Sequence, residues 1–281
     1  MNNFDAIKIG SKILKSNNIK SYILDSELLL AKILNSSREH ILTNQNNHLK
    51  SDNFKKYKKL ILRRKNNEPI AYILKRKGFW KFNFNVSSDV MIPRPETELI
   101  VQEVLKIISY KKSKKILDVG TGSGCIIISI LKERQNCKAT AIDISKKALK
   151  IAITNAKMHH LKNKISFINI DVDKFNHNKY DFVISNPPYI NKICFQRLDD
   201  DVKNFEPKIA LEGGTDGFRE IKKLIFKSSK LLKKGGNLIF EIGMNQSEHS
   251  KYLLYKNGFY INKICKDLNS INRVIVSTKI S

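Results

Sequence analysis

Hydrophobic residues recur at helical spacing through about the first 75 residues, a stretch that contains one glycine and one proline, Gly10 and Pro69. One face of residues 21–34 holds Leu24, Leu28 and Ala31, and one face of residues 51–64 holds Phe54, Tyr57, Leu60 and Ile61. Each of the two segments begins with a serine that can cap the first helical turn. The pattern predicts two packed helices within a small helical domain, which we place at residues 1–77.

The period of the pattern changes after this helical region. Between residues 78 and 90 aromatic and polar residues alternate, and a period of two is typical of a β-strand. Pro93 and Pro95 then fix the backbone φ angle and favour extended neighbours, so a helix is expected to begin at Thr97 or Glu98. We therefore expect a β-hairpin and proline-rich linker at residues 78–95 and a second domain at residues 96–281.

Short β-branched segments alternate with helical segments through this second domain. Strands are expected at residues 114–120, 138–143, 164–170, 180–186 and 236–243, and helices at residues 125–133, 145–159 and 218–233. Such alternation predicts a parallel sheet with helices on both faces. The last two segments, 258–266 and 272–279, are too close together for a helical crossover and should pair antiparallel. The expected fold class is α/β, Rossmann-like, with a mostly parallel sheet and an antiparallel C-terminal strand.

The composition narrows the class of protein. With 41% hydrophobic and 28% charged residues, the 281-residue chain is globular rather than disordered. Its longest apolar run, residues 125–131, is far shorter than the roughly 20 residues that span a bilayer, and the start shows no signal peptide. The cysteines, Cys125, Cys137, Cys194 and Cys265, are scattered, which argues against a disulfide framework and a metal site. We expect a protein of the reducing cytoplasm without metal or membrane partner.

The chain is strongly basic, with 52 Lys+Arg against 26 Asp+Glu and a formal net charge of +26. Such a balance commonly indicates a polyanionic partner. Here the excess is mainly lysine, spread along the whole chain and accompanied by abundant asparagine and isoleucine. We interpret it as compositional bias of an AT-rich genome and solvated faces, with a real acidic surface or an RNA contact as the alternative.

A glycine-rich segment from Asp118 to Gly124 lies between a predicted strand and a predicted helix. Gly120, Gly122 and Gly124 let the backbone turn sharply and approach a ligand closely, with Thr121 and Ser123 between them. The GxGxG spacing differs from the GxGxxG of dinucleotide folds, and Asp118 before it can hold an ammonium group rather than a phosphate. This points to S-adenosylmethionine, although a tight turn without a ligand would look similar.

Two further acidic residues follow later strands of the predicted sheet. Asp143 ends the next strand, 19 residues after Gly124, where a carboxylate can accept the hydrogens of both ribose hydroxyls. Asp171 closes the strand after that, and Asp171 with Val172 is placed to meet the adenine edge and face. Asp171 can equally act as a helix cap.

The tetrapeptide Asn186-Pro187-Pro188-Tyr189 ends the strand at residues 180–186, at the sheet edge where open α/β folds bind ligands. Asn186 Oδ1 and the Pro187 carbonyl can accept the two hydrogens of a planar amide or exocyclic amine. They would orient that nitrogen and stabilise the positive charge that grows as a methyl group arrives, while Tyr189 packs on the planar group. The alternative is a proline-stiffened turn that only ends the strand.

Together these motifs resemble a known family, the bacterial peptide chain release factor N5-glutamine methyltransferases, which are class I S-adenosylmethionine-dependent enzymes. The resemblance covers nearly the whole chain. It rests on the helical N-terminal domain, residues 68–73 (EPIAYI), Phe79-Trp80, residues 92–98 (IPRPETE), the glycine loop, the NPPY motif and residues 210–217 (ALEGGTDG).

The resemblance implies a function and a partner. Residues 120–124, Asp143 and Val172 would bind the cofactor, and residues 186–189 would hold the glutamine. The implied substrate is the glutamine in the GGQ loop of class 1 release factors, which act in translation termination. The N-terminal helices and the hairpin would help to hold the release factor. We expect a monomer without a specific nucleic-acid partner.

The chain departs from the family pattern at a few positions. Lys75 and Gly78 stand where family members more often have Gly and Glu, and Val172 stands where some have an aromatic residue. Ser270 and Asn272 stand where Gly and Asp are usual. These positions bear on cofactor affinity and on the last turn of the chain.

Three other functions stay open at this point. A ribosomal-protein glutamine methyltransferase would use similar chemistry, but that group more often has Ser at the position of Pro95. An adenine-N6 methyltransferase faces the same planar nitrogen but must flip its base and contact phosphates. A non-catalytic RNA- or ribosome-binding protein would not need Asn186 or Asp143.

Overall fold

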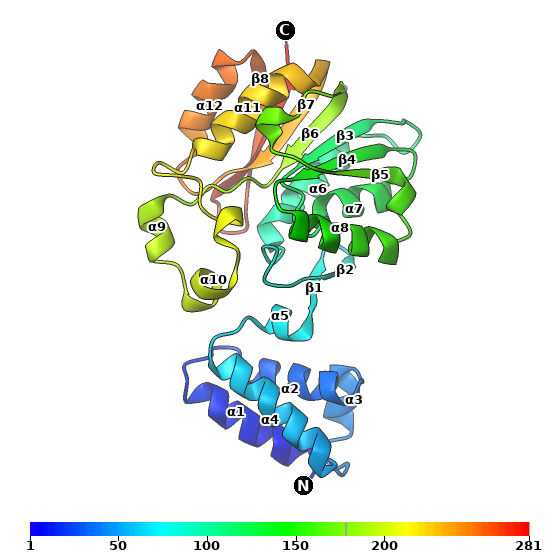
Figure 1. Ribbon diagram of the computed structural model, residues 1–281, viewed down its shortest axis with the longest axis vertical. Helices are drawn as coiled ribbons and strands as arrows, with labels where there is room; N and C mark the ends of the chain where they lie inside the picture. The colour runs from blue at the N-terminus through cyan, green and yellow to red at the C-terminus, as the bar shows by residue number, and fades with distance from the viewer. Residues whose placement is uncertain (178, 281) are drawn as a thin grey trace. The chain divides into compact units, whose positions relative to one another are not determined.

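The computed structural model describes residues 1–177 and 179–280 and divides into two compact units. Unit 1 comprises Met1–Lys75 with Asp199–Phe205, and unit 2 comprises Arg76–Leu198 with Glu206–Ser281 (Figure 1). Each unit has its own hydrophobic core.

Unit 1 is helical. Its helices are α1 (Asn3–Lys15), α2 (Tyr22–Ile33), α3 (Arg38–Thr43), α4 (Ser51–Lys65), α5 (Ile70–Leu74) and the short α10 (Asp200–Phe205). The two predicted helices are therefore confirmed, and Tyr57 and Ile61 of α4 are buried as expected. Inside this unit Arg64 Nε donates to Asp25 Oδ2 over 2.7 Å, and both side chains are largely buried.

Two details of the helical prediction are wrong. Leu24 is exposed. The buried face of α2 carries Leu29 and Leu30 together with the polar residues Asp25 and Ser26. The expected serine caps do not form either: α4 begins after Lys50, and Ser21 Oγ donates to Asp25 Oδ2 instead of accepting a backbone N–H.

A hairpin is present as predicted, but it begins at residue 76, two residues before the predicted range of 78–95. Strands β1 (Arg76–Phe79) and β2 (Phe82–Asn85) pair antiparallel. Phe79 and Phe84 are buried in a core of unit 2. The side chain of Asn155, in helix α8 (Lys146–Met158), accepts from Asn85 N over 2.7 Å and donates to Asn85 O over 3.0 Å. The end of the hairpin is thus tied to the helical layer beside the sheet.

Unit 2 contains a seven-stranded sheet of the predicted α/β class. Its strands are β3 (Lys115–Val119), β4 (Lys138–Asp143), β5 (Ile165–Asn169), β6 (Tyr180–Ser185), β7 (Leu232–Glu241), β8 (Phe259–Lys266) and β9 (Asn272–Lys279). The order is β5-β4-β3-β6-β7-β9-β8, with β3 to β7 parallel and β9 antiparallel to both of its neighbours. Parallel strands need crossovers, and the helices between them supply these.

Helices cover both faces of this sheet, as predicted. One buried cluster joins it to α6 (Glu98–Ile107), α7 (Cys125–Glu133) and α8 (Lys146–Met158). The other joins it to α11 (Arg219–Leu231) and α12 (Ser247–Lys256) (Figure 1). Helices α12 and α9 (Lys192–Gln196) were not predicted, because their short segments lack a clear apolar stripe.

Two departures from the family pattern lie where the backbone favours glycine. Lys75 ends α5 at φ +58°, and Ser270 lies in the turn between β8 and β9 at φ +62°. A side chain costs about 1–2 kcal/mol in this left-handed region. The turn is held by Asp267, whose Oδ1 accepts from Ile271 N and whose Oδ2 accepts from Arg273 Nε, both over 2.9 Å.

Within the described residues, every helix is too short or too polar to cross a membrane. The four cysteines are free thiols, of which Cys194 is exposed and the others are buried.

Candidate active site

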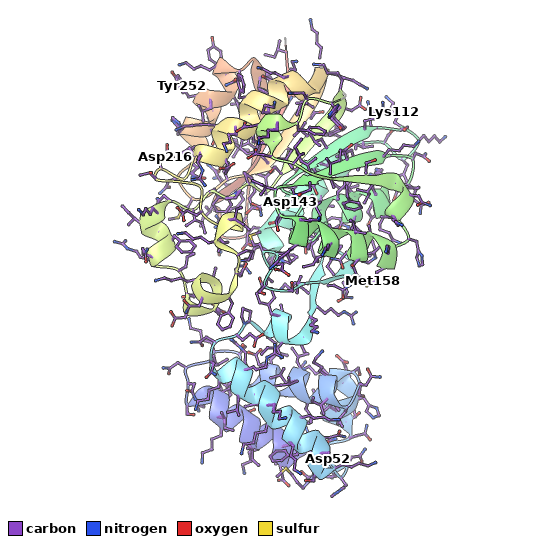
Figure 2. All side chains as sticks on the ribbon, in the orientation of Figure 1. Asp52, Lys112, Asp143, Met158, Asp216 and Tyr252 are labelled. Atoms are coloured by element: carbon purple, nitrogen blue, oxygen red, sulfur yellow. The ribbon has the colours of Figure 1, made fainter. Side chains whose placement is uncertain are left out.

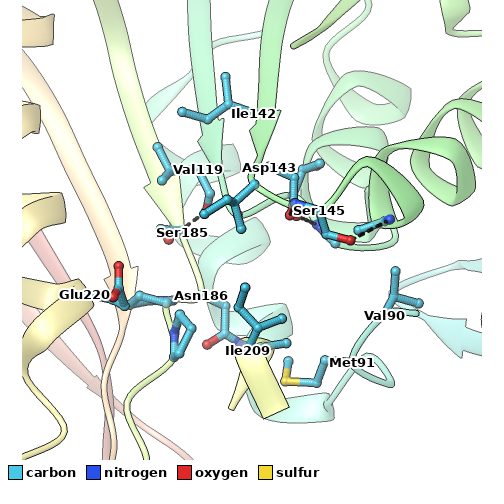
Figure 3. Close-up of a pocket in the computed structure, with 18 of the residues that line it drawn as sticks. Val90, Met91, Val119, Ile142, Asp143, Ser145, Ser185, Asn186, Ile209 and Glu220 are labelled. Atoms are coloured by element: carbon cyan, nitrogen blue, oxygen red, sulfur yellow. Dashed lines mark hydrogen bonds between the residues drawn. The ribbon is translucent and has the colours of Figure 1, made fainter. Parts of the chain in front are cut away.

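A cavity of about 350 Å³ opens at the carboxyl ends of β3, β4 and β6. Most of the residues singled out in the sequence line it, namely Gly120, Thr121, Gly122, Ser123, Asp143, Asp171, Val172, Asn186, Pro187 and Pro188. Figure 3 shows Asp143, the last residue of β4, and Asn186, the residue after β6, on the wall of this cavity. The fold therefore brings together motifs that are as much as 68 residues apart in the chain.

The glycine loop connects β3 to α7 and turns toward β4. Gly120, Gly122 and Gly124 all have positive φ angles, between +55° and +79°. The N–H groups of Gly120 and Thr121 donate to Ile142 O over 2.9 and 3.1 Å. A Cβ atom on Gly124 would lie 3.0 Å from Ile128 Cδ1, so this glycine also lets the helix pack closely. Gly124 itself is the N-cap of α7 and is not among the residues that line the cavity.

Asp143 lies against the glycine loop. Its Oδ2 accepts from Gly122 N over 2.9 Å, and its Oδ1 accepts from Ser145 N over 2.8 Å. Burial raises the pKa of Asp143, while these two bonds lower it. Each carboxylate oxygen has a further lone pair, so Asp143 can accept hydrogens from two vicinal hydroxyls of a ligand.

Asp118 lies beneath the loop rather than on the cavity wall. It is fully buried, and its Oδ2 accepts from the Thr121 hydroxyl over 2.6 Å. Burial raises the pKa of Asp118 to about 7, against the Thr121 hydrogen bond. Its Oδ1 has no hydrogen-bond partner among the described residues. The role of Asp118 in holding an ammonium group stays a prediction.

Asp171 and Val172 both line the cavity. Asp171 also caps a 3₁₀ turn (Val172–Lys174), since its Oδ1 accepts from Asp173 N over 2.9 Å. The Asp171 carboxylate therefore acts as the helix cap that the sequence analysis gave as its alternative role, and Asp171 also lines the cavity. Val172 adds an apolar surface beside Ile144 and Ile170.

The NPPY segment begins at the end of β6 and is joined to two residues that the sequence did not single out for chemistry. Asn186 Nδ2 donates to Thr97 Oγ1 over 3.0 Å, and Thr97 Oγ1 donates to Glu241 Oε2 over 2.6 Å. Tyr189 Oη donates to Glu241 Oε1 over 2.9 Å. Thr97 and Glu241 are buried, and Thr97 lines the cavity. These four side chains form a relay from the core to the cavity.

The direction of the relay follows from its carboxylate. An ionised Glu241 can only accept, so the Thr97 hydroxyl donates to it and accepts from Asn186. The amide nitrogen of Asn186 is then engaged, and its Oδ1 is the atom that the side chain can present as an acceptor. Burial raises the pKa of Glu241, and its bonds with Thr97 and Tyr189 lower it. Burial also raises the pKa of Tyr189, which remains a donor.

Thr97 and Glu241 had signals that could have been noticed. Thr97 lies inside the IPRPETE segment, whose prolines predict only the start of a helix there. Glu241 lies in the apolar strand segment LIFEIG, and a carboxylate in such a strand needs buried partners. The sequence could not name those partners, because Thr97 and Glu241 are 144 residues apart.

A loop from the ALEGGTDG segment braces the backbone of NPPY. Gly213 N donates to Ile190 O over 2.8 Å, and Ile190 N donates to Leu211 O over 3.0 Å. Gln246 Nε2 donates to Tyr189 O over 3.0 Å and to Gly217 O over 3.2 Å. The bracing fixes the position of the segment that carries Asn186.

Gly217→Ala is expected to destabilise the protein more than Gly235→Ala. Both glycines have nearly the same φ, +78° and +76°, so both variants lose about 1–2 kcal/mol to backbone strain. A Cβ atom at Gly217 would also lie 2.5 Å from Tyr189 O, whereas at Gly235 it would meet no described atom within 4 Å. We expect Gly217→Ala to lose a further 1–3 kcal/mol or so, measured by urea unfolding. Equal losses in the two variants would contradict the bracing contact.

Both the N-terminal and the C-terminal part of the chain match known protein families. Residues 95–198 match the family model of the methyltransferase small domain, and residues 5–74 match that of the PrmC N-terminal domain. The chain is 38% identical over 281 residues to a release factor glutamine methyltransferase of Clostridium botulinum, covering 98% of each protein. It is 34% identical over 278 residues to one of Clostridium acetobutylicum, again covering 98% of each.

A solved structure agrees on the fold. The crystal structure of a methyltransferase from Pyrococcus furiosus matches with a TM-score of 0.55 at 16% identity. The match covers 80% of this chain and 98% of that one.

Proposed function

Because the chain belongs to the release factor glutamine methyltransferase family, we propose that it methylates the side-chain nitrogen (N5) of a release factor glutamine. The acceptor is the glutamine of the GGQ loop in class 1 release factors. The chain is an S-adenosylmethionine-dependent methyltransferase of class I. The observation that carries the proposal is one cavity lined by the glycine loop, Asp143 and the first three residues of NPPY.

The cavity fits S-adenosylmethionine. A Cβ atom built on Gly120 would meet open space, so the loop can be approached closely by a ligand. The Asp143 carboxylate is placed to accept the ribose hydroxyls, and Val172 with Ile144 and Ile170 provides an apolar surface for the adenine. Asp118 Oδ1 is a buried acceptor without a described partner, beneath the loop. When bound there, S-adenosylmethionine supplies an electrophilic methyl group.

The residues of NPPY would orient the acceptor amide. Asn186 Oδ1 and the Pro187 carbonyl would accept the two N–H hydrogens of the glutamine, which turns the nitrogen lone pair toward the donor side of the cavity. A carboxamide is a poor nucleophile, so positioning and charge stabilisation must supply most of the catalysis. The negative charge of Glu241, transmitted through Thr97, favours the positive charge that develops on the nitrogen. The proton can leave to water after transfer.

We further propose that residues 1–77 bind the substrate protein, residues 78–95 link the parts, and residues 96–281 perform the methyl transfer. Support comes from the match of residues 5–74 to the model of the PrmC N-terminal domain. The protein is proposed to act as a monomer in the cytoplasm, where release factors work. Its proposed partner is the release factor, with no specific nucleic acid required for the reaction.

A methyl-transfer assay with labelled S-adenosylmethionine tests the function. A release factor, the same factor with the GGQ glutamine replaced, a ribosomal-protein fraction and duplex DNA are offered in parallel. We expect label on the intact factor alone. Label on the ribosomal fraction or on DNA instead would show that the enzyme methylates another substrate and would overturn the release factor assignment.

A further inference from the structure

The amino edge of the sheet in unit 2, opposite the cavity, collects a large share of the positive charge. The segments that border this edge are residues 108–115, 134–138, 159–164, 175–177 with 179, 230–237, 255–258 and 278–280. They contain fourteen lysines and arginines, and Asp181, which follows one of them, is the acidic residue that lies among them. At the ratio of 52 to 26 found in the whole chain, fourteen basic residues would come with about seven acidic ones. Uniform compositional bias does not account for this segregation.

The lysines face one another across neighbouring strands. Lys115 on β3 and Lys138 on β4 are direct partners in the sheet register. Like charges at directly opposed positions destabilise a sheet. The pKa of Lys279 at the end of β9 is lowered by burial and by the charge of Lys179. Lysines are often found near helix C-termini because the helix dipole stabilises a positive charge there. This effect does not explain the positions of Lys115, Lys138 and Lys279, which lie on strands.

A second cavity of about 300 Å³ lies in the same edge. Its lining includes Lys112, Lys114, Lys233 and Lys234, with Asp181 as the acidic residue. Asp181 Oδ1 lies 2.9 Å from Lys233 Nζ and 3.8 Å from Lys114 Nζ. The carboxylate thus pairs with two of the four lysines that line this cavity. Figure 2 shows Lys112 far from Asp143, which marks the catalytic cavity at the other end of the strands.

From this arrangement we propose that the amino edge of the sheet, defined by these seven segments, binds the phosphodiester backbone of RNA. Adjacent strands are about 4.8 Å apart, so the edge presents an extended row of cations rather than a compact site. A flexible chain with one charge per nucleotide can follow such a row. Lysine binds phosphate as a point charge and needs no fixed geometry.

An aromatic side chain on this edge fits the same partner. Tyr110 is 69% exposed, and the Arg134 guanidinium lies 4.1 Å from the centre of its ring. The Arg134 side chain is itself buried against the ring, so the exposed part of Tyr110 is the surface on which an unpaired base can stack. The choice of RNA over DNA rests on the proposed function, because an enzyme that modifies a translation factor works where RNA is the abundant polyanion.

The test compares two variants that each lose four charges. The edge variant changes Lys111, Lys112, Lys138 and Lys234 to Gln, which leaves the ion pairs of Asp181 in place. The control variant changes Lys55, Lys56, Lys58 and Lys59 of α4 to Gln. All eight lysines are exposed. Binding of a labelled 20-nucleotide poly(U) RNA is measured by fluorescence anisotropy between 50 and 200 mM salt.

We expect the edge variant to bind the RNA at least about tenfold more weakly and its log–log salt slope to fall by about 3, at roughly 0.7 per lost phosphate contact. The control variant should bind like the unchanged protein. Equal weakening in both variants, or tight binding by the edge variant, would overturn the proposal. Binding of a polyglutamate peptide or of phosphatidylserine vesicles in preference to RNA would overturn it as well, in favour of an acidic protein or a membrane.

The methyl-transfer assay on the free release factor separates this proposal from the proposed function. The edge variant should methylate the factor like the unchanged protein, because its four lysines lie away from the catalytic cavity. Loss of RNA binding with full methylation is the expected result. RNA binding through the edge without methylation of any release factor would instead contradict the proposed function and support the RNA-binding surface.

Discussion

Replacing Asn186 with alanine is expected to lower turnover by about a hundredfold or more, while the affinity for S-adenosylmethionine changes little. The variant removes the Oδ1 acceptor that the relay turns toward the cavity, and loss of one preorganised polar contact with the reacting group costs about this much. The glycine loop and Asp143, which are proposed to hold the cofactor, keep their hydrogen bonds in this variant. Single-turnover methyl transfer and calorimetric cofactor binding measure the two effects.

Asn191→Ala is the matched control for this prediction. Asn191 lies five residues further along the same segment, but its Oδ1 accepts from Cys194 N over 2.7 Å and caps α9. The control loses an asparagine side chain of the same size outside the cavity lining, so its turnover should stay within a few-fold of the unchanged protein. Near-normal turnover of Asn186→Ala would remove the proposed mechanism.

The fold could be predicted well because it depends on local patterns. The period of two at residues 78–90 predicted the hairpin, and the alternating segments after Lys114 predicted the order of strands and helices. The strand at residues 138–143 and the helix at residues 125–133 agree with the structure residue for residue. Local pattern failed in α2, where Asp25 and Ser26 are buried because Arg64 and Tyr57 of α4 bind them. Such pairing between helices leaves no periodic signal.

The positions of the candidate site residues could be predicted from the topology of the sheet. The hydrogen bonds that join them could not be predicted in this way. Asp143 and Asn186 were placed at one sheet edge because the carboxyl ends of parallel strands meet there. Thr97 and Glu241 were missed, since a hydrogen bond between residues far apart in sequence requires the folded chain. The lysines of the amino edge were missed for the same reason. Their seven segments are spread along the chain, so their position at one sheet edge becomes visible only in the folded protein.

Thr97→Val is expected to lower turnover by between about tenfold and a hundredfold, with Thr97→Ser close to the unchanged protein. Valine keeps the shape of threonine but removes the hydroxyl that accepts from Asn186 Nδ2 and donates to Glu241 Oε2. The Asn186 amide then loses the contact that fixes its orientation, so Oδ1 faces the substrate only part of the time. Serine retains the hydroxyl. Equal turnover of the valine and serine variants would show that the relay does not position Asn186.

The pH dependence of turnover tests the direction of the same relay. Ionised Glu241 accepts from Thr97, but a protonated Glu241 can donate to it, and the Thr97 hydroxyl would then donate to Asn186 and turn the amide around. Burial raises the pKa of Glu241 above the usual value of 4.5, and the nearby charge of Glu96 raises it further. Arg273 and the hydrogen bonds from Thr97 and Tyr189 lower it.

Turnover should therefore fall with decreasing pH through this raised pKa, well before an exposed glutamate would titrate. Glu241→Gln should have low turnover at every pH and lose the acidic limb, because glutamine does not titrate. Unfolding measured over the same pH range separates a change in the relay from loss of structure. An acidic limb that persists in Glu241→Gln would assign the titration to another group and contradict the direction of the relay.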